Sequence, residues 1–194
     1  SGWNSGVEYY QPYSSAIGHG YLDSYLTLSL TGDYKNADWG IYNPITNGGN
    51  KEGLWRNLTK DEWQYVFKER PNAQKLYVKA CVNGIDGIIL FPDDFFENRV
   101  NVAIDYNKPD CIWTNNIYDK NVWDILEGLK AVFLPCKYFG SSFGWVYETS
   151  TIAEIKEDQV KVYAAIADVK TTRVEIGTSP SLNKNSIRLI QEVI

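Results

Sequence analysis

Hydrophobic positions in the middle third of the chain recur at helical spacing in two places. The first run, "KDEWQYVFKER" at 60–70, follows the capping box that Thr59 and Glu62 form, and Pro71 stops it. The second run, "DKNVWDILEGL" at 119–129, has apolar residues three and four apart and weakens towards its end. The pattern therefore predicts one helix over each run.

Between these runs the pattern changes to the alternation of β-strands. Residues 76–91 read as a hairpin, because "KLYVKACV" alternates and "GIILF" is a continuous apolar strand. Asn83 and Gly84 supply the tight turn. Pro92 ends the second strand because proline has no backbone N–H to donate. A further apolar strand, "AVFLP" at 131–135, is expected after the second helix.

The last third of the chain shows period-two patterns in "GWVYET", "VKVYAAIADV", "TRVEIG" and "SIRLIQEV", which predict an antiparallel meander of four strands. Residues 3–53 are rich in Gly, Asn, Ser and Tyr and predict long ordered loops with one strand at 25–30. Two helices, loops and a C-terminal antiparallel sheet make an α+β fold, which we expect to be a single domain over residues 1–194.

Charge and composition limit the classes of molecule that the chain is expected to bind. The net charge is −5 and no cluster of Lys and Arg compensates it, so nucleic acid is disfavoured as a partner. No apolar run approaches the roughly 20 residues that span a bilayer, so no membrane insertion is expected in this segment. The chain begins "SGWNSG" and contains no Met, from which we expect a processed or truncated piece.

Few residues suit nucleophilic or metal chemistry. His19 is the only histidine, so it would have to serve any Ser-His or Cys-His pair, and a histidine-rich metal site is excluded. The cysteines Cys81, Cys111 and Cys136 form no zinc-binding spacing. A Cys111–Cys136 disulfide and three free thiols both remain open. No cofactor is predicted from these residues.

Calcium is the one ion that the acidic residues suit. Asp93 and Asp94 follow Pro92, and Asp110 precedes the amides of "WTNN", so hard oxygen ligands lie close together in the sequence. Asp and Asn also cap turns through bonds from side chain to backbone, and we favour that interpretation. Adjacent carboxylates on an extended chain point apart, so Asp93 and Asp94 do not suit a hydrolase pair.

Several blocks carry a resemblance to a known family. "ADWGIYNPITNGGN", "GLWRNLTKDEWQYVF", "VNGIDGIILFPDDF", "GLKAVFLPCKYFG" and "NSIRLIQEVI" occur in that order. Together they resemble the C-type-lectin-like domains of exported proteins from gut Bacteroidetes, from about Trp39 to Val193. The resemblance implies the fold shared with formylglycine-generating sulfatase modifiers and retroelement variable proteins. It also implies a secreted or cell-surface location and a ligand-binding role.

The chain departs from that family in informative ways. "GWVYET" stands where relatives carry an aromatic-Trp-Ser strand, so Tyr147 replaces a core Trp, and Cys136 and Lys137 replace small residues. Relatives also carry a strand-forming segment before the opening Gly-Trp, so we expect the chain to lack an N-terminal segment of the full protein. The enzyme relatives use a cysteine pair, but no cysteine follows Cys136, so their activity is not expected.

The function predicted from these observations is a non-enzymatic, monomeric module that binds a carbohydrate or protein ligand. Trp145, Asn183 and Asn185 are the candidate contacts, because aromatic faces and side-chain amides suit sugar rings and hydroxyls. Trp145 also suits the core, since it lies in an alternating strand. The alternatives are a structural module of a larger adhesin or fimbrial protein and an enzyme like the sulfatase modifiers.

Overall fold

The computed structural model describes residues 56–95, 101–106, 113–139, 142–156, 159–167, 173–180 and 185–191. The predicted strand at 25–30 and His19 lie outside these residues. The described chain divides into two compact units. The first unit contains the described residues within 56–60, 147–164 and 177–191, and the second contains those within 61–146 and 165–176.

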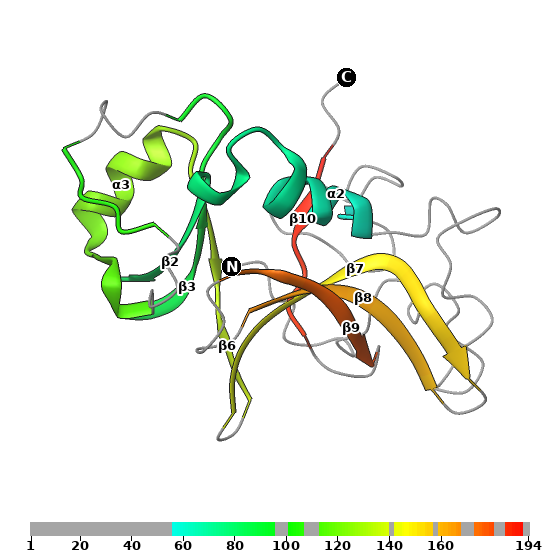
Figure 1. Ribbon diagram of the computed structural model, residues 1–194. Coiled ribbons are helices and arrows are strands. Elements are labelled where there is room, and N and C mark those ends of the chain that lie inside the picture. The colour runs from blue at the N-terminus through cyan, green and yellow to red at the C-terminus, as the bar shows by residue number, and fades with distance from the viewer. Residues whose placement is uncertain are drawn as a thin grey trace. The chain divides into compact units, whose positions relative to one another are not determined.

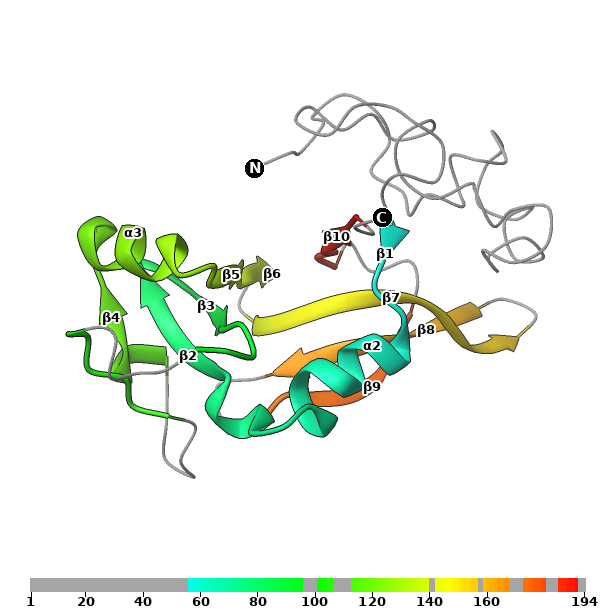
Figure 2. The same ribbon diagram turned by 90° about the horizontal axis from the view of Figure 1, so that it is seen from above.

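The second unit contains a four-stranded sheet, whose two middle strands are labelled in Figure 1 and all four in Figure 2. Its strands are β2 (Tyr77–Val82), β3 (Ile85–Leu90), β4 (Ile117–Tyr118) and β5 (Val132–Pro135), in the order β4-β2-β3-β5. β3 is antiparallel to both β2 and β5, whereas β4 pairs with β2 in parallel. The strand predicted from "AVFLP" is therefore confirmed as an edge of this sheet.

The hairpin predicted at 76–91 is also confirmed. Val82 pairs with Ile85, which leaves Asn83 and Gly84 as a two-residue turn with φ angles of 50° and 78°. Positive φ at both central residues is the geometry of a type I′ turn, which follows the right-handed twist of the strands. The Asn-Gly pair thus fixes the register of β2 against β3.

Both predicted helices are present, and one has an unexpected second half. α2 (Lys60–Gln64) begins directly after Thr59, and the helical path continues as the π-helix η3 (Tyr65–Glu69). α3 (Lys120–Gly128) begins at Asp119, whose side chain accepts a hydrogen bond from the Val122 backbone N–H at 2.9 Å. Two short 3₁₀ helices, η4 (Ala73–Lys75) and η6 (Trp113–Asn115), flank the strands.

Apolar side chains cover both faces of the sheet in the second unit. On one face, alternate residues of β2 and β3 pack with Leu126. Leu126 belongs to α3, and α3 lies beside β2 and β3 in both ribbon views (Figure 2). On the other face, the Phe67 ring lies 5.0 Å from Tyr77 and 5.7 Å from Trp145 between ring centroids. The sheet is therefore the middle layer of an apolar core.

The C-terminal strands differ in part from the prediction. β6 (Lys137–Phe139), β7 (Ser142–Lys156), β8 (Gln159–Ala167) and β9 (Glu175–Pro180) form a sheet in that order. The last predicted strand, "SIRLIQEV", does not become a fifth member of that sheet. Among its described residues, Ser186 forms a single parallel bridge with Tyr147 of β7, and β10 (Leu189–Ile190) pairs with β1 (Arg56–Asn57).

A local hairpin adds a strand at the opposite edge, which the period-two pattern did not single out. β6 pairs antiparallel with β7 through the register of Phe139 with Ser142, and closing so short a loop costs little entropy. β6 therefore forms the edge of the sheet beside β7. The coarse prediction of an α+β fold with two helices and mostly antiparallel sheets is confirmed.

Candidate functional site

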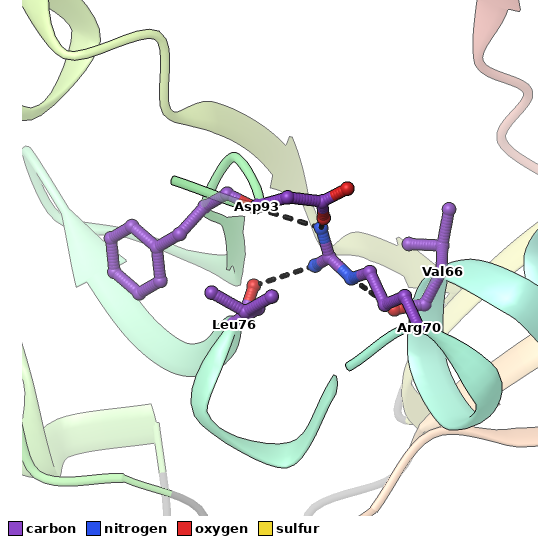
Figure 3. Close-up of polar contacts among 5 residues, drawn as sticks. Val66, Arg70, Leu76 and Asp93 are labelled. Carbon is purple, nitrogen blue, oxygen red and sulfur yellow. Dashed lines mark hydrogen bonds and ion pairs between the residues drawn. The ribbon is translucent and has the colours of Figure 1, made fainter. Parts of the chain in front are cut away.

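Asp93, a calcium candidate, is part of a clamp centred on Arg70 (Figure 3). The buried Arg70 guanidinium donates through Nε to the carbonyl oxygen of Val66 at 2.8 Å. Its two terminal nitrogens donate to the carbonyl oxygens of Phe91 and Leu76, each at 2.9 Å. One of them also pairs with Asp93 Oδ1 at 3.0 Å. The clamp joins the end of η3 to the start of β2 and the end of β3.

This arrangement assigns Asp93 a structural partner. Its side chain is 63% exposed and Asp94 is exposed as well, so both carboxylates face solvent. The turn that follows closes with a hydrogen bond from the Phe95 N–H to the Pro92 carbonyl at 3.1 Å. Asp110 lies outside the described residues. Within the described residues, no group of three or more His, Cys, Asp or Glu side chains is arranged to hold a metal ion.

Asn116, which belongs to the other calcium candidate, is buried and fully engaged by the fold. Its Nδ2 donates to the carbonyl oxygens of Lys79 and Asp105, each at 2.8 Å. Its Oδ1 accepts from the Asp105 N–H at 2.8 Å and from the Tyr118 hydroxyl at 3.1 Å. The amide therefore ties residues 101–106 to β2 through bonds from its side chain to the backbone.

Two thiols flank a carboxylate on one face of the second unit's sheet. Cys81 is opposite Asp86 in the β2–β3 register, and the Cys136 N–H donates to the Asp86 carbonyl at 2.7 Å. Burial, and then the Asp86 carboxylate, raise the pKa of the Cys136 thiol to about 12. Burial and the hydrogen bond with Asp86 also raise the pKa of Cys81.

Both thiols are thus protonated near neutral pH, whereas the thiolate is the form that acts as a nucleophile or metal ligand. Cys81 and Cys136 are free cysteines. Cys111, the proposed disulfide partner of Cys136, lies outside the described residues. Nucleophilic chemistry at neutral pH has no support from this pair.

Trp145, the aromatic candidate, lies in the core of the second unit. Its relative exposure is 0%, and its indole N–H donates to the Leu134 carbonyl at 3.0 Å. Its ring meets those of Trp63 and Phe67 edge to face, at 6.4 and 5.7 Å between centroids. Trp145 therefore offers no exposed ring face to a ligand. Asn183, the second candidate, lies outside the described residues.

Asn185, the third candidate, is half-buried and lies in a polar cluster of the first unit. Its Nδ2 donates to Glu148 Oε1 on β7 and to Ser179 Oγ on β9, each at 2.7 Å. The Glu148 N–H donates to the Ser186 carbonyl at 2.9 Å, which brings the segment that carries Asn185 alongside β7. Both N–H groups of Asn185 are therefore directed inward, and Oδ1 accepts no hydrogen bond from any residue that the structure describes.

The surroundings of this cluster are unusually polar. Glu148 is 0% exposed and Ser179 5%. In the described part of the first unit, the buried polar residues outnumber the buried apolar ones. The polar set is Asn57, Glu148, Thr149, Ser179 and Ser186, and the apolar set is Leu58, Tyr147, Val162 and Ala164. Buried carboxylates are costly unless they are hydrogen-bonded, so such a cluster is a candidate for function.

No sequence pattern pointed to Glu148 or Ser179. In "GWVYET" the alternation places Glu148 on the face opposite Trp145 and Tyr147, where a charged residue is ordinarily exposed. Ser179 lies in the turn-rich "TSPSLNKN", where serine is typical of a loop. Only the pairing of distant segments brings both to Asn185.

Comparisons of the chain with protein-family models, with curated proteins and with solved structures find no match. None of the helices in the described part of the chain has both the length and the apolar character needed to cross a membrane.

Proposed function

We propose that the chain is a non-enzymatic binding module of a secreted or cell-surface protein, and that Asn185 is a ligand contact. The observation that carries this proposal is the fixed orientation of the Asn185 amide by two bonds of 2.7 Å to Glu148 and Ser179. The resemblance to C-type-lectin-like domains, carried by the ordered sequence blocks, supports the same role.

Pre-organisation is the physical reason for choosing this residue. A ligand that contacts a side chain already held in one orientation does not have to order it, so less binding free energy is lost. Glu148 and Ser179 are themselves buried and cannot move without disturbing the sheet that carries them. Asn185 is the one member of the three that is only half-buried, so it is the member that a ligand can reach.

The raised pKa of Cys136 argues against the enzyme alternative. Oxidative chemistry of the sulfatase-modifier type needs reactive cysteines, and the Cys136 thiol stays protonated at neutral pH. A structural module of a larger adhesin is the other alternative. It requires no ligand contact at Asn185, and the proposal differs from it on that point.

The test is a screen of the purified chain against a glycan array and a panel of extracellular proteins, with and without calcium. We expect binding that Asn185→Ala weakens by about tenfold or more, the loss of a well-oriented hydrogen bond. Asn121→Ala is the matched control, because Asn121 is an exposed asparagine on α3. Equal binding by the wild type and N185A would reject the site, and binding to nothing would favour the structural module.

A further inference from the structure

We infer that Glu148 determines which end of the Asn185 amide faces the ligand, and that the site therefore selects neutral or amine-bearing sugars over anionic ones. The inference rests on the proposed function and adds to it the charge class of the ligand. It assigns Glu148 a positioning role, because Glu148 acts through Asn185.

The direction of the amide follows from what each group can donate. A carboxylate only accepts hydrogen bonds, and an asparagine side chain has an accepting end and a donating end. Nδ2 of Asn185 donates to Glu148 Oε1 at 2.7 Å. With Glu148 ionised, Oδ1 in the place of Nδ2 would set two acceptors against each other. Ser179 Oγ can donate or accept, so Ser179 does not decide the direction.

No residue that the structure describes donates to Oδ1, so the end of the amide that we assign to a ligand is this acceptor. It suits a ligand group that donates a hydrogen bond, such as a sugar hydroxyl or an ammonium group. A sulfate or carboxylate has only acceptors to offer and would meet an acceptor with a carboxylate directly behind it. The same contact that positions Asn185 thus excludes anions, and the net charge of −5 adds a weak repulsion of the same sign.

Glu148→Gln tests the positioning role with an isosteric change. The glutamine amide has both a donor and an acceptor, so it can pair with either end of the Asn185 amide and frees that amide to turn over. The probes are methyl β-galactoside, its 6-amino-6-deoxy analogue and its 6-sulfate, which share one ring and differ in one group. Their binding is followed at millimolar concentration by chemical-shift changes in the ¹⁵N-labelled chain.

We expect the wild type to bind the hydroxyl and amino probes about tenfold or more tightly than the sulfate. In E148Q this preference should largely disappear, because the Asn185 amide can turn over and present its Nδ2 donor to the sulfate. Ser179→Ala should keep the preference, since it leaves Glu148 in place. Asn185→Ala should weaken binding of the hydroxyl and amino probes. A second measurement is made without any ligand, on the rate at which the Asn185 Nδ2 protons exchange with water. This exchange should be slow in the wild type and faster in E148Q.

The outcomes separate the two proposals. Binding of the sulfate as tightly as the hydroxyl probe, or a preference that E148Q leaves unchanged, overturns the role of Glu148 while the binding function stands. Rapid exchange of the Asn185 Nδ2 protons in the wild type does the same. No binding of any of the three sugars overturns the carbohydrate form of the proposed function, and the inference with it.

Discussion

Replacing Arg70 by methionine should destabilise the chain far more than replacing its acidic partner, Asp93. Arg70→Met keeps an apolar side chain in the buried position but removes all the donors of the guanidinium. Asp93→Asn keeps the shape of the partner and removes only its charge. The pair of variants therefore separates the backbone contacts of Arg70 from its ion pair.

The magnitudes follow from the burial of each contact. The bonds to the Phe91 and Leu76 carbonyls are buried. The Phe91 carbonyl loses its donor in R70M, which costs about 1–3 kcal/mol. The Leu76 carbonyl still accepts from the Phe91 N–H at 2.9 Å, so the loss of its second bond costs only about 0.5–1.5 kcal/mol. The Val66 carbonyl is only part-buried, so water can replace the lost donor there. We expect R70M to lower the free energy of unfolding by about 1.5–4.5 kcal/mol. The ion pair is with a carboxylate that is 63% exposed, so D93N should cost about 0–1 kcal/mol.

Urea denaturation followed by tryptophan fluorescence measures both variants, provided that the slope of free energy against urea stays the same. Arg70→Lys should fall between them, because an ammonium group cannot reproduce the planar fork of the guanidinium. If D93N costs as much as R70M, the ion pair and not the backbone clamp stabilises this region. An R70M variant as stable as the wild type would refute the reasoning altogether.

The remaining predictions concern the packing of two glycines, a buried thiol and calcium. Gly87→Ala should be destabilising by about 1–3 kcal/mol, because the added Cβ would lie 2.5 Å from both the Leu134 carbonyl oxygen and the Phe133 ring. A Cβ added at Gly128 would have nothing within 4 Å, so Gly128→Ala should stabilise α3 by about 0.5–1 kcal/mol in the same urea assay. The raised pKa of Cys136 stabilises the fold fully below the ordinary thiol pKa of 9.0, and this contribution should be lost as the pH rises towards about 12. Cys136→Ala should lack that part of the pH dependence of the unfolding free energy, and identical profiles for the variant and the wild type would contradict the assignment. EDTA should leave the melting temperature unchanged, and a drop that calcium reverses would show that the chain needs the ion.

Local signals account for the parts of the fold that could be predicted. The turn at Asn83 and Gly84 and the start of α3 at Asp119 each depend on residues within a few positions, and the structure confirms both. The pairing of β10 with β1 joins segments more than a hundred residues apart, and no alternation pattern specifies a partner at that distance. The π-helical second half of the first helix likewise has no sequence signal that we recognise.

The candidate site follows the same division. Asn185 could be chosen from the sequence because a side-chain amide suits sugar hydroxyls. The orientation of this amide depends on Glu148, which lies 37 positions away. The alternation in "GWVYET" predicted that Glu148 would be exposed. A sequence pattern reports which residues can be buried at low cost, and a buried carboxylate is the case in which that rule fails. Such failures are expected where a side chain is held for binding and not for stability. Glu148 is therefore more informative about function than the residues that the pattern placed correctly, and the Asn185 amide that it orients is the place to look for a ligand.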